Sequence, residues 1–176
     1  EILAMTNEPE YDLNNPYELN SDLLISSTGT SKMDLLNNMW RNFCINDTYE
    51  PGSIFKMVTA TAALETGSVT LNDHFTCGGS AIVADRKIRC HKTTGHGTQT
   101  FTQTVMNSCN PAFIEWGRRV GVDNFYKYMC KLGLLEKTGI DIAGEASTIV
   151  HKQENVGEVE LATMSFGQSF QITPIQ

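Results

Sequence analysis

The sequence has little positive charge and no long apolar run. Its 176 residues carry 13 Lys and Arg against 20 Asp and Glu, which gives a net charge of −7. A nucleic-acid-binding surface needs a basic face, so this balance argues against nucleic acid as a partner. No stretch approaches the ~18–20 continuous apolar residues of a membrane span. The first five residues lack the basic start and the cleavage box of a signal peptide.

Proline is also scarce, and no internal repeat or low-complexity tract is visible. Hydrophobic residues make up 40% of a chain of one domain's length, which is enough apolar matter to offset the entropy of ordering it. We therefore expect one folded domain. Because the sequence opens in mid-pattern without Met, we also expect it to be part of a longer protein.

Disulfide pairing cannot organise the whole chain, because five cysteines cannot all pair with one another. They also include no C-x-x-C pair. Either some are buried thiols or a subset binds a metal. The cysteines are Cys44, Cys77, Cys90, Cys109 and Cys130.

The chain divides at residue 49 into a polar, loop-rich lead-in and a part richer in helix. Residues 1–48 predict only a short strand at 2–6 and one or two helical turns at 33–39. Residues 49–176 predict a β-hairpin at 75–90 and several helices. The helices are expected at 53–66, which is apolar nearly all round and should be buried, at 98–106, from Pro111 onward, at 124–132, and at 159–166.

A serine and a lysine stand three residues apart at the start of the first of these helices. At helical spacing the side chains of Ser53 and Lys56 share one face. A serine hydroxyl is a poor nucleophile unless a base takes its proton, and a desolvated lysine with a lowered pKa can do so. The alternative is a lysine that extends to the surface.

A second pair of polar residues lies in the expected break between two helices, in Ser108-Cys109-Asn110, just before Pro111. A short loop of this kind can aim a hydroxyl and an amide at one point. By itself the pattern is more typical of turns and helix caps.

Taken together, these motifs resemble those of the penicillin-binding transpeptidases, which combine S-x-x-K with S-x-N. Further stretches resemble the monofunctional, class B branch, and the resemblance covers nearly the whole chain. The stretches are Tyr49 to Lys56, Ser108-Cys109-Asn110, Ala4-Met5 with Asp12 to Asn14, Trp40-Arg41-Asn42, Gly95-His96-Gly97, Thr138 to Asp141 with Gly144-Glu145, and Phe166-Gly167-Gln168 with Thr173 to Gln176.

The resemblance implies roles for four residues. Ser53 would be the nucleophile that attacks a D-Ala–D-Ala peptide or is trapped by a β-lactam, and Lys56 its base. Ser108 would relay a proton to the leaving amine. Asn110 would hold the substrate amide and contact Lys56.

The family's third motif is K-T-G, and Lys137-Thr138-Gly139 spells it only 29 residues after Ser108. In the family the functional triplet lies on a strand beyond the segment matched by Thr173 to Gln176, so we interpret Lys137 as a decoy. That strand carries an oxyanion donor, and losing one such donor typically costs ~10²–10³ in rate. We therefore expect the 176 residues alone to be inactive.

Four residues suggest a zinc site beside the serine. Cys77 and Cys90 bracket the expected hairpin, His96 follows, and the side chain of Cys109 should point away from Ser108. A Cys₃His set suits a closed, structural tetrahedral zinc. Some elongation-type relatives look similar, with zinc held by a histidine in the same Gly-His-Gly and a cysteine in the S-x-N motif.

Two alternatives to zinc remain open: buried thiols with a capping histidine, and a Cys77–Cys90 disulfide favoured by an extracytoplasmic location. His91 is the alternative imidazole, but neighbours on a strand point to opposite faces, which favours His96. Cys44 and Cys130 are expected to be structural.

The resemblance implies an α+β fold of the penicillin-binding transpeptidase and serine β-lactamase type, of which residues 1–176 would form part, mostly the helical lobe. The N-terminal anchor and the strands of the C-terminal sheet would lie outside this sequence. The parent protein would cross-link peptidoglycan stem peptides at the extracytoplasmic face of the membrane, bind β-lactams, and work with a glycan-polymerising membrane protein. The alternatives are a D,D-carboxypeptidase or β-lactamase, a non-enzymatic β-lactam sensor, and a zinc-stabilised scaffold module.

Overall fold

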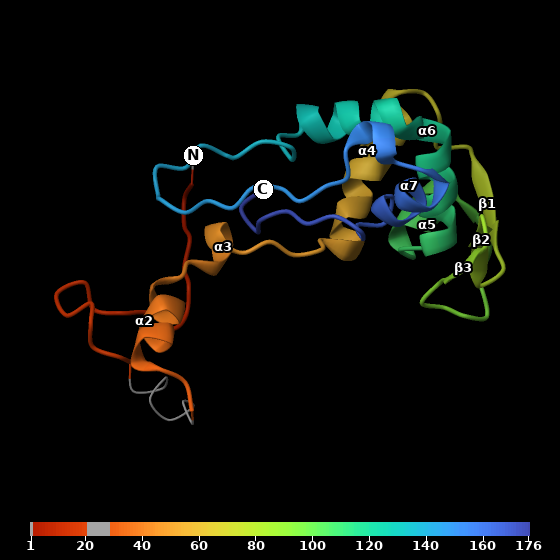
Figure 1. Ribbon diagram of the computed structural model, residues 1–176. Coiled ribbons are helices and arrows are strands. Elements are labelled where there is room, and N and C mark those ends of the chain that lie inside the picture. Colours follow the sequence, from red (N-terminus) through yellow and green to blue (C-terminus); the bar gives the residue numbers. More distant parts are fainter. Residues whose placement is uncertain (1, 21–28) are drawn as a thin grey trace.

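A computed structural model describes residues 2–20 and 29–176. The lead-in extends away from the remainder as loops that carry two helices, α2 (Lys32–Trp40) and α3 (Phe43–Asn46) (Figure 1). Residues 1 and 21–28 of the predicted 1–48 lead-in lie outside the described part. The predicted helical turns at 33–39 are confirmed and extended by α2.

The predicted strand at 2–6 is wrong. Residues 2–7 have no regular secondary structure. They run beside α3 instead, where the Thr6 carbonyl accepts a hydrogen bond from Cys44 Sγ at 3.6 Å and Asn7 Oδ1 accepts one from the backbone N–H of Phe43 at 2.9 Å. An apolar run of five residues becomes a strand only where another strand pairs with it, and here a helix is its neighbour.

The helix that carries the S-x-x-K motif begins as a 3₁₀ turn, η1 (Gly52–Phe55), and continues as α4 (Lys56–Glu65). One face of it is buried, as expected, through Phe55, Lys56 and the alanines. The expectation of burial all round is wrong, because Ile54 and Met57 are 57% and 66% exposed. The small alanine side chains let one neighbouring helix pack closely, and that contact covers only one side.

That neighbour is α6 (Asn110–Lys131), which makes the largest helix–helix contact with α4 and also packs on α7 (Glu158–Met164). The predicted separate helix at 124–132 is the second half of α6, after a kink at Gly121 (φ 75°). Helix α7 confirms the prediction at 159–166, although it ends two residues earlier. A 3₁₀ turn, η2 (Gln153–Asn155), precedes α7.

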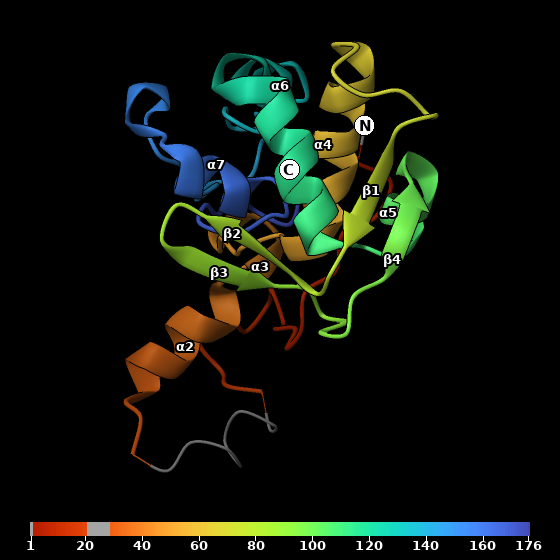
Figure 2. The same cartoon turned by 90° about the vertical axis from the view of Figure 1, so that its right-hand side faces the viewer.

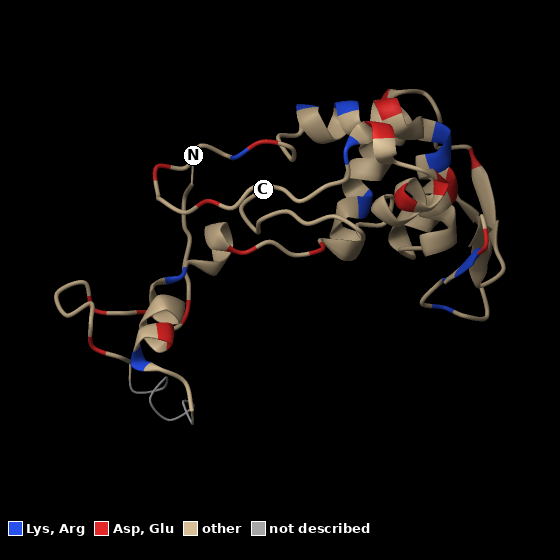
Figure 3. Ribbon diagram, in the orientation of Figure 1, with Lys and Arg blue, Asp and Glu red and all other residues tan. Residues whose placement is uncertain are grey.

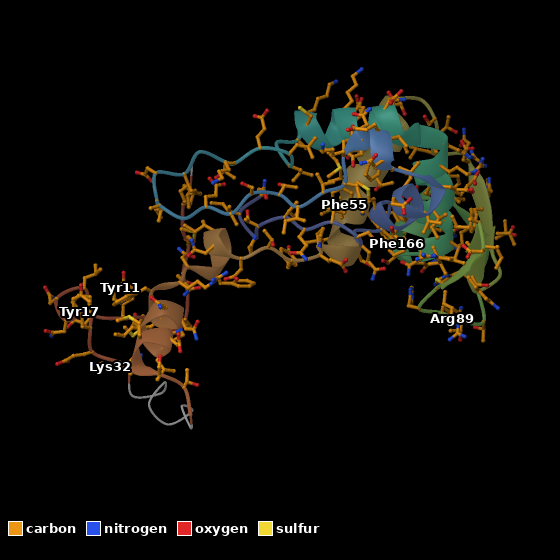
Figure 4. The ribbon with its side chains drawn as sticks, in the orientation of Figure 1. Tyr11, Tyr17, Lys32, Phe55, Arg89 and Phe166 are labelled. Carbon is orange, nitrogen blue, oxygen red and sulfur yellow. The ribbon has the colours of Figure 1, made fainter. Side chains whose placement is uncertain are left out.

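The core lies where these helices meet. Its largest fully buried side chains include Trp116 and Phe113 on α6 and Phe125 beyond the kink. Phe55 and Phe166 point into the same interior beside α4 (Figure 4). Such aromatic burial supplies most of the stabilisation of a small core. The S-x-x-K helix therefore lies on a rigid support.

The predicted hairpin at 75–90 is only partly correct. Strands β2 (Ser80–Val83) and β3 (Arg86–Arg89) form an antiparallel hairpin across Ala84-Asp85. Strand β1 (His74–Cys77) leaves this pairing, because the chain turns at Gly78-Gly79.

Strand β1 pairs instead with β4 (Gly97–Thr100), in a segment predicted to be helical from Thr98. Helix α5 (Phe101–Met106) begins three residues later than expected, with Thr100 and Gln103 forming a capping box. The β-branched threonines pair across the strands, and Thr76 Oγ1 lies 2.9 Å from Thr98 Oγ1. Partner strands therefore override the local helical pattern.

The two small sheets lie against the N-terminal half of α6, on either side of it (Figure 2). No helix within the described ranges is long and apolar enough to cross a membrane. The architecture is thus a helical core with two two-stranded sheets at one end, an α+β arrangement.

Candidate active site and thiol cluster

The turn before Ser53 is held by the C-terminal part of the chain. Gly52 N–H donates to the Gly167 carbonyl at 2.8 Å, and Ser169 N–H donates to Glu50 Oε1 at 2.8 Å. Gly167 has φ 84°, and a Cβ built on it would stand 2.0 Å from the Gly52 oxygen. Only glycine fits this approach. The Phe166-Gly167-Gln168 stretch therefore braces the turn that presents Ser53.

Lys56 Nζ is the hub of the candidate active site. It donates to Ser53 Oγ at 3.2 Å, to Ser108 Oγ at 2.9 Å and to Asn110 Oδ1 at 2.6 Å. It also donates to the Ser108 carbonyl at 2.8 Å. The structure thus brings together the four residues that the motifs singled out, from two segments about fifty residues apart.

Strain in the backbone shapes the second of these segments. Ser108 has φ 46°, a left-handed conformation that non-glycine residues rarely adopt. In this conformation its carbonyl and its hydroxyl both face Lys56. Cys109 follows as the N-cap of α6, and Asn110 begins the helix. The loop therefore aims three oxygen atoms at one amine.

Burial sets the charge state of this amine. Lys56 is 3% exposed, and burial lowers its pKa from 10.5 to about 8, although the nearby Cys90 and Cys109 thiols oppose the shift. Its Nζ also lies 5.5 Å from the centre of the Phe113 ring. A lysine of this kind has an appreciable neutral fraction near neutral pH and can accept a proton.

The thiol cluster lies directly behind this site. The ligand atoms of Cys77, Cys90, His96 and Cys109 all lie within 4.8 Å of one another. The three cysteines are buried, and Cys109 is completely inaccessible. Cys109 faces the cluster while Ser108 and Asn110 face Lys56, as expected from the sequence.

Two glycines let the loops of the cluster approach each other. Gly79 and Gly95 have φ 93° and 84°. A Cβ on Gly79 would stand 2.0 Å from the Thr93 carbonyl oxygen, and one on Gly95 would stand 2.3 Å from that of Cys77. This approach brings the backbone N–H groups of Gly79 and His96 to the Cys77 sulfur. Burial raises the pKa of the Cys77 thiol, but the hydrogen bonds to the sulfur outweigh it and the pKa is lowered. Such N–H donors stabilise a thiolate.

The other thiols and the second imidazole take different positions. All five cysteines are free thiols in the structure, so the Cys77–Cys90 disulfide does not form in it. Cys44 and Cys130 lie outside the cluster, and the expectation of a structural Cys130 is wrong, because its side chain is exposed on α6. His91 is exposed, with Nδ1 3.9 Å from Cys90 Sγ and its ring 5.1 Å from that of His96.

Two residues of the site were not predicted from the sequence. Phe113, which contacts Lys56, lies one helical turn after Asn110, so its helical spacing could have placed it on the same face. Gln99 is a buried strand residue beside Cys109, where its side chain lowers the pKa of the thiol while burial, the larger effect, raises it to about 12. Its Nε2 is the buried side-chain nitrogen without an ordinary hydrogen-bond partner among the described residues. Nothing in the pattern of β4 marked it.

The Lys137-Thr138-Gly139 triplet lies in a loop, not on a strand. The backbone N–H groups of Thr138 and Gly139 donate to the Glu145 carboxylate at 2.6 and 3.3 Å. This contact, with the charge of Lys137, helps keep the pKa of Glu145 low although burial raises it. The triplet therefore has a structural use within its own loop.

Comparison with known proteins places this geometry in context. The family model for the penicillin-binding protein transpeptidase domain matches residues 1–176. Stage V sporulation protein D of Bacillus subtilis is 48% identical over 137 residues, which is 77% of this chain and 21% of that protein. Peptidoglycan D,D-transpeptidase FtsI of Escherichia coli K12 is 26% identical over the whole chain and 27% of its own length.

Solved structures agree on the fold. PBP2 of Pseudomonas aeruginosa, solved with WCK 5153, superposes with a TM-score of 0.82 over 99% of this chain and 41% of its own, at 24% identity. PBP2 of Helicobacter pylori, solved with MreC, gives 0.73 over 82% of this chain and 29% of its own, at 28% identity. The chain spans about a fifth to just over a quarter of the curated relatives' length. The predicted family and α+β fold are confirmed, and the chain belongs to the penicillin-binding protein transpeptidase domain family.

Proposed function

We propose that the full-length protein carrying this chain is a peptidoglycan D,D-transpeptidase that works through an acyl-serine at Ser53. One observation carries the proposal: a buried lysine with a pKa of about 8 lies within hydrogen-bond distance of Ser53, Ser108 and Asn110. A base, a nucleophile and a second hydroxyl in mutual contact are the parts that acyl transfer needs.

Acylation follows from these contacts. Neutral Lys56 takes the Ser53 proton as Oγ attacks the carbonyl of the D-Ala–D-Ala bond, and the negative charge moves to the carbonyl oxygen. Ser53 lies in the first turn of η1, where backbone N–H groups have no partner within the helix and can stabilise that oxygen. The C–N bond then breaks, and the proton reaches the departing amine from Lys56 through Ser108.

The second half-reaction returns the enzyme to its starting state. An amine of a second stem peptide loses a proton to the Ser108–Lys56 pair and attacks the acyl carbonyl. A new amide forms and the Ser53 oxygen leaves with the returned proton. The Oδ1 atom of Asn110 accepts from Lys56, and one N–H of its Nδ2 donates to the Arg89 carbonyl at 3.4 Å, so the second N–H is the donor left for the donor peptide. The net result is one peptide bond exchanged for another.

The test is a covalent mass measurement on the full-length protein after β-lactam treatment, with the adduct mapped. We expect one adduct, on Ser53, and none in Ser53→Ala. Thr61→Ala is the matched control, because Thr61 is exposed on α4 and its hydroxyl bonds only within the helix. An adduct elsewhere, or none in the parent protein, contradicts the proposal.

Two rivals have distinct outcomes. A D,D-carboxypeptidase or β-lactamase would use water as the acceptor and would release the penicilloyl group rapidly. A non-enzymatic sensor or scaffold would keep its cellular role in Ser53→Ala. For a transpeptidase we expect slow deacylation and loss of cross-linking in that variant.

We also propose a structural zinc ion at Cys77, Cys90, His96 and Cys109. In a tetrahedral site with Zn–S bonds of ~2.3 Å the ligand atoms stand about 3.8 Å apart, so a cluster already within 4.8 Å fits after small movements. The buried Gln99 amide beside Cys109, whose side chain lowers the pKa of that thiol, is a donor suited to a metal-bound thiolate. Such a site would join the two small sheets to the S-x-N loop.

Metal analysis of reduced, dialysed full-length protein tests this site. We expect about one zinc per chain, and far less in Cys77→Ser. Cys130→Ser is the control, because Cys130 is an exposed thiol outside the cluster. Absence of near-stoichiometric zinc from the parent protein would leave buried thiols as the better interpretation.

The proposed reaction implies a location and partners. Peptidoglycan stem peptides lie outside the cytoplasmic membrane, so we propose a membrane-anchored protein in which this domain is extracytoplasmic. A glycan-polymerising membrane protein is the proposed partner, and the Helicobacter pylori PBP2 solved with MreC supports work within assemblies. Labelling of intact cells by a membrane-impermeant fluorescent penicillin should reach Ser53.

A further inference from the structure

The densest run of positive charge in this acidic chain lies in one short segment. Four of the 13 Lys and Arg fall within residues 86–92, while the whole chain has a net charge of −7. We name this set the basic strip, and Figure 3 shows its blue segments along β3 at the edge of the molecule. Its members are Arg86, Lys87, Arg89 and Lys92.

The basic strip is exposed, and none of its members forms an ion pair with an acidic residue of the described part. All four side chains belong to exposed residues. The ion pairs within the described part of the chain involve Arg41, Arg118 and Arg119, and no member of the strip. Exposed cations usually attract nearby carboxylates of the same chain, so an unpaired set on an acidic protein is available for an anionic ligand.

Strand register places two of these cations on one face. Lys87 is opposite Ile82, and Arg89 is opposite Ser80, so these side chains share the outer face of the hairpin. Val83 and Ile88 fill the inner face, against the core. Lys87 and Arg89 are two residues apart along the strand, about 7 Å. That spacing suits two carboxylates of one peptide.

The strip begins at the candidate active site. Asn110 Nδ2 donates to the Arg89 carbonyl at 3.4 Å, while Oδ1 of the same side chain accepts from Lys56. The backbone of Arg89 is therefore two hydrogen bonds from the proposed base, and its side chain lies on the outer rim (Figure 4). A ligand bound along the strip would have one end near Ser53.

We propose that the basic strip binds carboxylates of the peptidoglycan stem peptide and orients the peptide toward Ser53. This inference rests on the proposed function. The rest of the chain is even more acidic than the net charge of −7, so on average it repels an anionic peptide, whereas the strip attracts one. Local attraction within a repulsive field both steers and aligns a charged substrate.

The experiment compares two variants of the full-length protein of equal net charge. One is Lys87→Gln with Arg89→Gln, and the control is Lys127→Gln with Lys152→Gln, both exposed residues outside the strip. The substrates are one synthetic stem peptide with free carboxylates upstream of its D-Ala–D-Ala end and the same peptide with those groups amidated. The readout is kcat/KM for release of D-Ala, with fluorescent penicillin labelling of Ser53 measured in parallel.

We expect the strip variant to lose roughly fivefold in kcat/KM on the carboxylate peptide, the size of two exposed ion pairs. On the amidated peptide we expect less than a twofold change, and the control should behave like the parent protein. The difference should shrink as salt rises from 0.05 to 0.5 M, because the charges are exposed to solvent. Penicillin labelling of Ser53 should stay complete.

Equal losses on both peptides, or unchanged rates on both, would overturn the inference. Unchanged peptide rates with weaker binding to phosphatidylglycerol vesicles would assign the strip to lipid headgroups instead. Failure of the proposed function looks different: the parent protein would then neither label with penicillin nor turn over either peptide, and the inference would fall with it.

Discussion

Acylation of Ser53 should rise with pH and level off above about pH 9. The neutral form of Lys56 is the proposed base, and its pKa lies near 8 because the amine is buried. The neutral fraction is then about 9% at pH 7 and about 91% at pH 9, so the second-order acylation rate should rise about tenfold over this interval. An ordinary lysine would give about a hundredfold rise with no plateau there.

The assay is the rate of adduct formation with a fluorescent penicillin on the full-length protein, from pH 6 to 10. Hydrolysis of the β-lactam in buffer is subtracted at each pH. A single rise with a midpoint near 8 supports the mechanism, since kcat/KM reports the free enzyme. A rate that still climbs tenfold per pH unit above 9, or one independent of pH, refutes the role of Lys56 as the neutral base.

Stability gives an independent check on the same group. Between pH 8 and 10.5 the unfolded chain binds a proton at Lys56 that the folded chain does not, so this residue stabilises the fold increasingly as pH rises, by about 3 kcal/mol across the window. Below pH 8 the penalty for burying the charge is fully present. Above pH 8 the change at Lys56 therefore favours both the neutral base and the folded state, so if activity falls near pH 10, another group is responsible.

Three further variants and one control, Gly133→Ala, test the site. Asn110→Asp puts a carboxylate where Oδ1 lies 2.6 Å from Lys56 Nζ, so it should raise the lysine pKa by about 1–3 units, slow acylation at pH 7 at least tenfold, and move the pH profile upward. Gly167→Ala should destabilise the protein by roughly 2–4 kcal/mol in denaturation experiments and slow acylation, since its Cβ meets the Gly52 oxygen. Gly133→Ala, at φ 76° in open space, should cost only about 1 kcal/mol. Lys137→Gln should change the acylation rate less than twofold, and a loss of tenfold or more would contradict the interpretation of its triplet as structural.

Local sequence determined the parts of this protein that depend on short spacing. Ser53 and Lys56 share a face because a helix places residues three apart together. The thiol of Cys109 points away from Ser108 and Asn110, as the sequence led us to expect, although Ser108 takes up a left-handed conformation to achieve it (φ 46°). Both features were predictable without knowing what packs against them.

Only the tertiary structure decided which segments meet. Strand β1 does not continue into the β2–β3 hairpin, because the chain turns at Gly79. It pairs with β4 instead, although the sequence predicted a helix from Thr98, within β4. The pKa of Lys56 is likewise a property of packing, since burial by residues distant in sequence lowers it. Sequence spacing sets which side chains share a face; the solvation of the amine and the approach of the loops depend on long-range contacts that local patterns do not encode.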